Sequence, residues 1–163
     1  MEKERLLLCI GRYDHYFDSI NNKSNVLLSL EIFIVGGLIA AYPSLLDKVS
    51  CNLWLHLNMA ILISAGVANL LLITWTSIPF LSKEENSLLY FGAVSKLTQT
   101  EFRSRSGSAL HDAELNDLQN QVHALATGLY RKFKRLQVAG YLLMIQFAFF
   151  IPLIILIVKN LNK

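Results

Sequence analysis

The chain contains few of the residues that build metal centres or covalent catalytic sites. It has two cysteines and four histidines among 163 residues, and these form no CxxC, HExxH or paired His/Cys spacing. The sequence therefore predicts no metal site and no cofactor. The P-loop, GxGxxG and GxSxG motifs are also missing, so we expect that the chain is not an enzyme of the classes that depend on them.

Formal charge is almost missing from three long apolar runs. Residues 53–80 and 138–158 contain no charged residue, and Ser24–Tyr42, which Pro43 ends, contains Glu31 alone. About 20 apolar residues in a helix cross a bilayer, at about 1.5 Å per residue. We therefore predict an all-α membrane protein with three transmembrane helices extended into a cytoplasmic helical bundle. A buried hairpin in a soluble core is the alternative for the first run, but three such runs argue against it.

Positive charges are spread unequally over the segments between these runs. Of the 15 lysine and arginine residues, three lie in residues 43–52 and 159–163, and the other twelve lie in residues 1–23 and 81–137. Cytoplasmic segments of membrane proteins are enriched in lysine and arginine. We therefore predict that residues 1–23 and 81–137 face the cytoplasm, and that residues 43–52 and 159–163 form an outer loop and an outer tail.

Both cytoplasmic segments carry apolar residues at helical spacing. In residues 1–23 these recur at intervals of three and four, which predicts an amphipathic helix. In residues 81–137 we predict one helix over Lys83–Phe102, a break at Arg103–Ser108, and a second helix that continues from Leu115 into the third run. Such stripes suit packing within one chain and contact between subunits, and both alternatives stay open.

One strongly polar side chain lies in each apolar run. An acidic residue within a membrane helix is costly and marks a functional site by default. At helical rise, Glu31, Asn69 and Gln146 each lie about 10–12 Å inside the cytoplasmic end of their run. The three side chains form a hydrogen-bonded contact that fixes helix register, or Glu31 from several copies forms an acidic ring that favours cations. Small residues in two of the runs allow another helix to approach closely; they are Gly36, Gly37, Ala40 and Ala41 in the first run and Ser64, Ala65, Gly66 and Ala68 in the second.

Cationic and short polar side chains near the cytoplasmic ends of the runs form a second group of candidates. Clustered cations at a cytoplasmic surface suit phosphate groups. The run Arg131–Arg135 also fits an anchor beside anionic lipid, and the polar face of residues 12–23 also fits a solvated surface. The nucleotide-binding candidates in this group are Arg12, Asp14, Asn21, Lys23, Arg103, Arg105, Arg131, Lys132 and Arg135.

Three pairs of motifs, in this order along the chain, resemble the Pycsar-type transmembrane effectors. They are Arg12-Tyr-Asp-His-Tyr-Phe-Asp18 with Asn21-Asn-Lys23, Ile78-Pro-Phe80 with Leu88-Leu-Tyr-Phe-Gly92, and Asp117-Leu-Gln-Asn-Gln-Val122 with Lys132-Phe-Lys-Arg-Leu136. The resemblance implies a bacterial anti-phage effector that answers a nucleotide signal from a partner cyclase or nucleotidyltransferase and then compromises the inner membrane. In the similar Hailong system, a short DNA oligomer restrains the effector. The matching positions add Asp117 and Gln121 to the ligand candidates.

We therefore expect a homo-oligomeric inner-membrane effector that forms an ion-conducting pore or disrupts the membrane. Its expected partners are membrane lipid, further copies of this chain, and a nucleotide second messenger, either a cyclic mononucleotide or a short oligonucleotide. One alternative is a passive membrane anchor for a soluble partner. Another is a small membrane enzyme that uses Asp14, His15 and Asp18, of which Asp14 and Asp18 are spaced to share a helix face.

Overall fold

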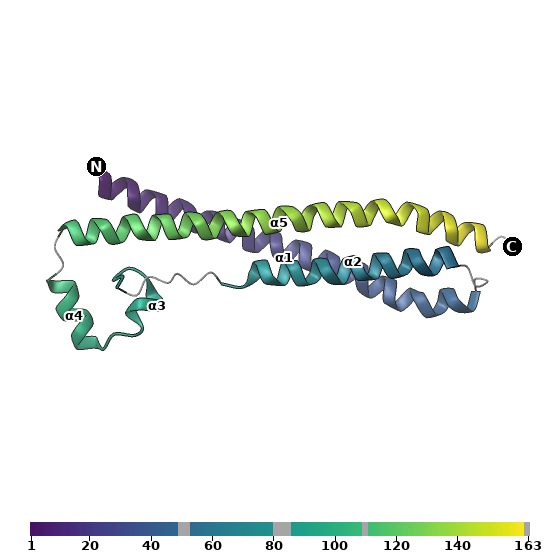
Figure 1. The fold of residues 1–163 in the computed structure, drawn as a ribbon, viewed down its shortest axis with the longest axis horizontal. Helices are drawn as coiled ribbons and strands as arrows, with labels where there is room; N and C mark the ends of the chain where they lie inside the picture. The colour runs from purple at the N-terminus through teal and green to yellow at the C-terminus, as the bar shows by residue number, and fades with distance from the viewer. Residues whose placement is uncertain (49–52, 80–85, 109–110, 162–163) are drawn as a thin grey trace. The chain divides into compact units, whose positions relative to one another are not determined.

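The computed structural model describes residues 1–48, 53–79, 86–108 and 111–161. Over these residues the fold contains helices and no strand. The helices are α1 (Glu2–Lys48), α2 (Leu53–Ser77), α3 (Phe91–Val94), α4 (Gln99–Gly107) and α5 (His111–Leu161), as Figure 1 shows. Three of them, α1, α2 and α5, are long and apolar enough to cross a membrane. The predicted all-α membrane fold is therefore confirmed.

The chain divides into two compact units. One, here named the polar unit, comprises Met1–Ser19 and Pro79–Lys132. The other, here named the membrane unit, comprises Ile20–Ile78 and Phe133–Lys163. Helices α1 and α5 each supply residues to both units. The exact ends of the three membrane spans stay predictions, and the predicted outer loop and tail lie partly outside the described residues.

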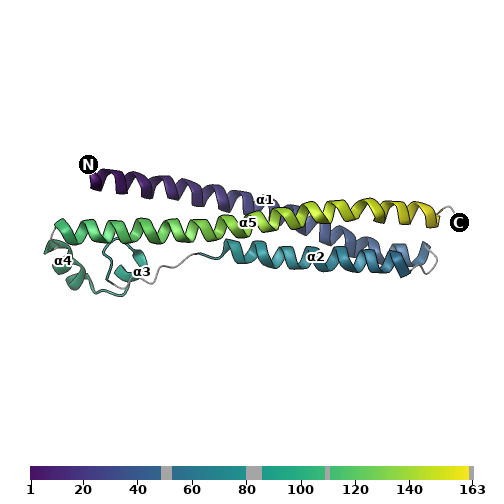
Figure 2. The ribbon, with the colours of Figure 1, turned by 45° about the horizontal axis from the view of Figure 1, so that its top comes forward.

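The membrane unit is a bundle of three helical segments with an apolar centre. In both views, α2 lies beside the C-terminal half of α5 (Figure 2). The buried residues of α2 are spaced by four and three, so one stripe of this helix faces the others; they are Leu55, Met59, Leu62, Gly66, Asn69, Ile73 and Thr76. Leu38 of α1 and Leu143 of α5 belong to the same core cluster.

Large apolar side chains also cover the outside of the membrane unit. Phe33, Trp54, Leu71 and Ile151 are each more than half exposed. In water such a surface would be costly, whereas in a bilayer it contacts lipid tails that are equally apolar. The outward side chains therefore agree with a position in the membrane.

Proline does not end the first membrane helix. The apolar run ends at Pro43, but α1 continues through this residue to Lys48. Proline lacks one backbone N–H, and membrane helices tolerate that loss because the other hydrogen bonds of the helix remain.

The predicted continuous helix over Lys83–Phe102 is wrong, because among its described residues only α3 (Phe91–Val94) and the start of α4 (from Gln99) are helical. Residues 86–90 are irregular and only the short α3 follows before α4. Side chains bind the backbone donors that a helix would use: Ser87 Oγ accepts from the N–H of Leu89 (3.1 Å) and of Tyr90 (2.9 Å). Serine competes with helix formation in this way. Residues 83–85 lie outside the described residues.

The predicted break at Arg103–Ser108 is also wrong, because Arg103 to Gly107 belong to α4. Helix α4 begins at a capping box, in which Thr98 Oγ1 accepts from Glu101 N–H (3.3 Å) and Glu101 Oε2 accepts from Thr98 N–H (2.8 Å). A threonine followed three residues later by a glutamate is the sequence signature of such a start. The break therefore comes before α4 and not within it. By contrast, the helix predicted from Leu115 into the third run is confirmed by α5.

Replacing Thr98 by alanine should fray the start of α4. The change removes the cap, which should speed amide hydrogen exchange in α4 about fivefold. The control is Ser104→Ala, an exposed position in the middle of α4. Equal exchange in both variants would show that the cap does not hold this helix.

Protection of α4 should also depend on pH. The backbone N–H and the hydroxyl of Thr98 both donate to the Glu101 carboxylate and hold the pKa of that carboxyl below its usual value. The stabilisation is therefore present above the unfolded pKa of about 4.3 and is lost as the pH falls through the lower folded pKa. Exchange rates in α4, corrected for their intrinsic pH dependence, should rise in this acid range in the wild type. In Glu101→Gln they should not change.

Candidate functional site

The membrane unit buries three strongly polar side chains, one from each long helix. Glu31 of α1, Asn69 of α2 and Gln146 of α5 are 0%, 1% and 2% exposed. Asn69 Nδ2 donates to Glu31 Oε2 at 3.0 Å, and Gln146 Nε2 donates to the backbone oxygen of Leu62 at 3.4 Å. We call Glu31, Asn69 and Gln146 the polar clasp. It joins three segments that are far apart in the sequence.

Gly66 provides the space in which two members of the polar clasp meet. A Cβ atom built on Gly66 would lie 2.9 Å from Glu31 Oε1 and 2.8 Å from Gln146 Nε2, and it would also overlap Val35 Cγ2. Contacts this short leave no room for a methyl group. The missing side chain of Gly66 is therefore what lets α1 and α5 approach α2 at this level.

The polar clasp has more acceptors than donors. Within the described part of the chain, Glu31 Oε1, Asn69 Oδ1 and Gln146 Oε1 are buried without a hydrogen-bond partner. An unpaired buried oxygen costs free energy that a proton donor or a cation can recover. The cluster therefore has acceptor capacity that its own donors do not use.

The contact within one chain supports the interpretation that these residues fix helix register. All three side chains face the interior of their own bundle. The alternative role of Glu31, as one member of an acidic ring around a pore axis, stays a prediction.

Replacing Gly66 by alanine should force the helices of the membrane unit apart. The added methyl group meets Glu31, Gln146 and Val35, so the melting temperature in detergent should fall by several degrees. The matched control is Gly37→Ala, where a Cβ atom has nothing within 4 Å. A Gly66→Ala variant as stable as its control would contradict the described packing.

The predicted nucleotide-binding residues are divided between the two units. Arg12 and Asp14 are exposed on α1, and Arg103 and Arg105 are exposed on α4, all in the polar unit. The polar unit also holds Gln121, Arg131 and Lys132 of α5, and Lys132 is only 6% exposed. Asn21, Lys23 and Arg135 belong to the membrane unit.

Two of these cations have aromatic neighbours. Arg12 donates to the Tyr16 hydroxyl one helical turn away at 3.3 Å. The Arg135 guanidinium lies 4.2 Å from the ring centre of Trp75, which is a cation–π distance. The sequence indicates Trp75 only as an aromatic residue near a membrane boundary, so this pairing with Arg135 was missed.

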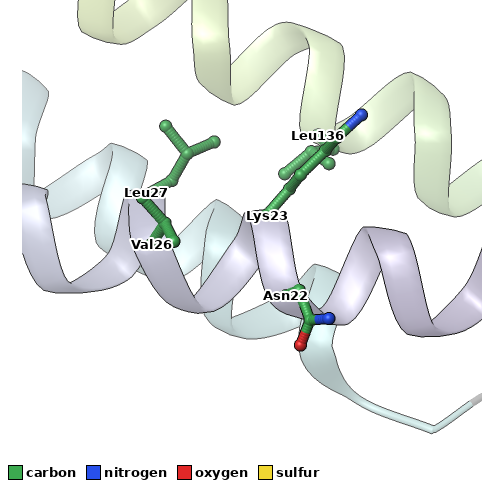
Figure 3. A pocket seen from close by; sticks show the side chains of 5 residues that line it. All are labelled: Asn22, Lys23, Val26, Leu27 and Leu136. Carbon is green, nitrogen blue, oxygen red and sulfur yellow. The ribbon is translucent and has the colours of Figure 1, made fainter.

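Lys23 lines an apolar groove of the membrane unit with a volume of about 420 Å³. The other lining residues are Asn22, Val26, Leu27 and Leu136. Figure 3 shows Lys23 extending from α1 towards α5, with Asn22 on the opposite side of α1. One cation at the end of an apolar groove fits a lipid with its tail in the groove better than it fits a free nucleotide.

Comparison with known protein families matches residues 5–159 to the Pycsar effector protein domain. No curated protein and no solved structure matches the chain. The matched range contains all members of the polar clasp and all the predicted ligand residues.

Proposed function

The chain belongs to the Pycsar effector family, which acts in anti-phage defence, and from this premise we propose how it works. We propose a homo-oligomeric effector of the bacterial inner membrane that lets ions pass, through a pore or a local disruption, under control of a nucleotide signal. The cytoplasmic helices bind that signal. Rearrangement of the three membrane helices then opens or closes the path.

The polar clasp is the observation that carries this proposal. A carboxyl group in the middle of a membrane helix is expensive unless it is paired or faces water. In the described state Glu31 is fully covered and accepts from Asn69. A protein that only anchored a partner needs no more of this residue than a fixed helix register, whereas a conducting state needs a polar surface along its path.

Control by a ligand requires two states with different affinity for it. The buried clasp supplies one such state, in which polar groups are hidden from the bilayer. In the second state, separation of the helices would expose the Glu31 carboxylate to water and to passing cations. In this proposal the clasp stabilises the closed state, and the signal shifts the balance by binding the two states with different affinity.

Replacing Glu31 by glutamine should change ion flow without preventing insertion. Glutamine keeps an oxygen that accepts from Asn69 but removes the negative charge that favours cations. In proteoliposomes, the preference for cations over anions should fall severalfold, and toxicity on expression should change with it. The control is Glu4→Gln, an exposed acid outside the membrane unit.

If Glu31→Gln conducts and kills like the wild type, Glu31 does not line the path. If the wild type neither leaks nor harms cells whatever signal is supplied, the chain is a passive anchor instead.

Assembly is tested by molar mass. Light scattering of the purified chain in detergent should give a mass of several copies, because the described helices of one protomer pack around an apolar centre and a path for ions would need further copies. A single copy under all conditions, with and without nucleotides, would rule out the proposed homo-oligomer.

A further inference from the structure

The polar unit contains a pocket that none of the features above uses. Its volume is about 360 Å³, which lies within the range of small-ligand sites. It is formed by the irregular segment after residue 85, by α4 and by the first turns of α5. The lining residues are Asn86, Leu88, Leu89, Phe102, Ser106, Ala113, Glu114 and Asp117.

One wall of the pocket carries a fixed hydrogen-bond acceptor. Asp117 Oδ2 accepts from the backbone N–H of Leu88 at 2.8 Å, and this bond holds the carboxylate in place. The other oxygen, Oδ1, accepts no hydrogen bond from the described residues. It is therefore free to accept from a ligand N–H.

The second carboxylate of the pocket is already compensated. Glu114 Oε1 lies 2.7 Å from Lys3 Nζ, so its charge is paired within the polar unit. Phe102 and the side chains of Leu88 and Leu89 supply the apolar surface. A flat, partly apolar ring with an N–H donor on its edge matches this lining, whereas a phosphate group inside it would face Asp117.

Helix α4 carries two cations on the flanks of the face that lines this pocket. Phe102 and Ser106 are one turn apart and face the cavity. At about 100° per residue, Arg103 and Arg105 then lie on either side of that face, each about a quarter turn away. Both side chains are exposed and long enough to reach over the rim. Guanidinium groups at this position suit a phosphate that stays outside the pocket.

We propose that this pocket receives the base of the nucleotide signal. The ring packs against Phe102, an exocyclic amino group donates to Asp117 Oδ1, and the phosphate binds Arg103 and Arg105 at the rim. Adenine, cytosine and guanine carry such an amino group. Uracil and thymine instead present one N–H between two carbonyl oxygens, and these oxygens are repelled by an acceptor such as Asp117 Oδ1. The proposal rests on the proposed nucleotide control and assigns it a site and a base preference.

Binding to the purified full-length chain in detergent tests this assignment. The probes are the four cyclic mononucleotides of A, C, G and U and short DNA oligomers of a single base. Within the series that binds, at least one amino-bearing base should bind about tenfold or more tightly than uracil or thymine. No preference for amino-bearing bases would overturn the assignment.

Asp117→Asn is the decisive variant. The asparagine oxygen can still accept from Leu88 N–H, while its NH₂ group replaces the free acceptor by a donor. The preference should therefore be lost or reversed towards uracil or thymine. The matched control is Asp112→Asn, an exposed acid in the first turn of α5 that does not line the pocket. Identical base preferences in the two variants would contradict the assignment.

Two further changes separate the base from the phosphate. Phe102→Leu should weaken binding of every base, and Arg103→Gln with Arg105→Gln should weaken binding and reduce its dependence on salt. Lys96→Gln, which removes an exposed cation elsewhere in the polar unit, should change neither the affinity for the probes nor its dependence on salt.

If the wild type binds probes and these pocket variants bind them equally well, the signal binds elsewhere and the proposed function stands. If no probe binds the wild type, nucleotide control itself fails together with the pocket.

Discussion

The structure of the membrane unit depends on one hydrogen bond, from the Asn69 amide to the Glu31 carboxyl at 3.0 Å. Without a partner, a carboxyl group at this depth would strongly oppose insertion. Gly66, which has no side chain, leaves the space that Glu31 and Gln146 occupy where α1 and α5 approach α2. It also sets the register of the helices, since a shift of one residue would turn Glu31 away from Asn69 and towards lipid.

In the proposed function, the same bond stabilises the closed state. With the clasp closed, polar groups are hidden and the membrane unit presents apolar side chains to the bilayer. Helices α1 and α5 supply residues to both units, so each is a continuous element that carries both ligand candidates and clasp residues. A signal that binds one arrangement of these helices more tightly than the other shifts the population of the closed clasp. The ratio of its affinities for the two arrangements sets the size of that shift. In the proposed function, the cost of the buried carboxyl would therefore be part of the switch.

The long helices and the depth of the polar side chains were predictable from the sequence, whereas their partners were not. Apolar length predicts the spans, and helical rise predicts that Glu31, Asn69 and Gln146 share a level. Rise says nothing about rotation, so the sequence left the contact among the three side chains as one of two alternatives. The same limit hid the pairing of Arg135 with Trp75. The prediction of a helix after residue 85 failed because the backbone N–H of Leu88 donates to Asp117, which lies 29 residues away in the sequence. For α4, the Thr98–Glu101 capping box was a readable signal that the serine-rich composition obscured.

Glu31 and Asn69 should stabilise the bundle through each other. A double-mutant cycle measures this directly, with unfolding free energies in detergent for the wild type, Glu31→Ala, Asn69→Ala and the double variant. The effects should not be additive, with a coupling of about 1 kcal/mol in favour of the pair. Additive effects within error would show that the two side chains do not interact, and would contradict the closed state described above.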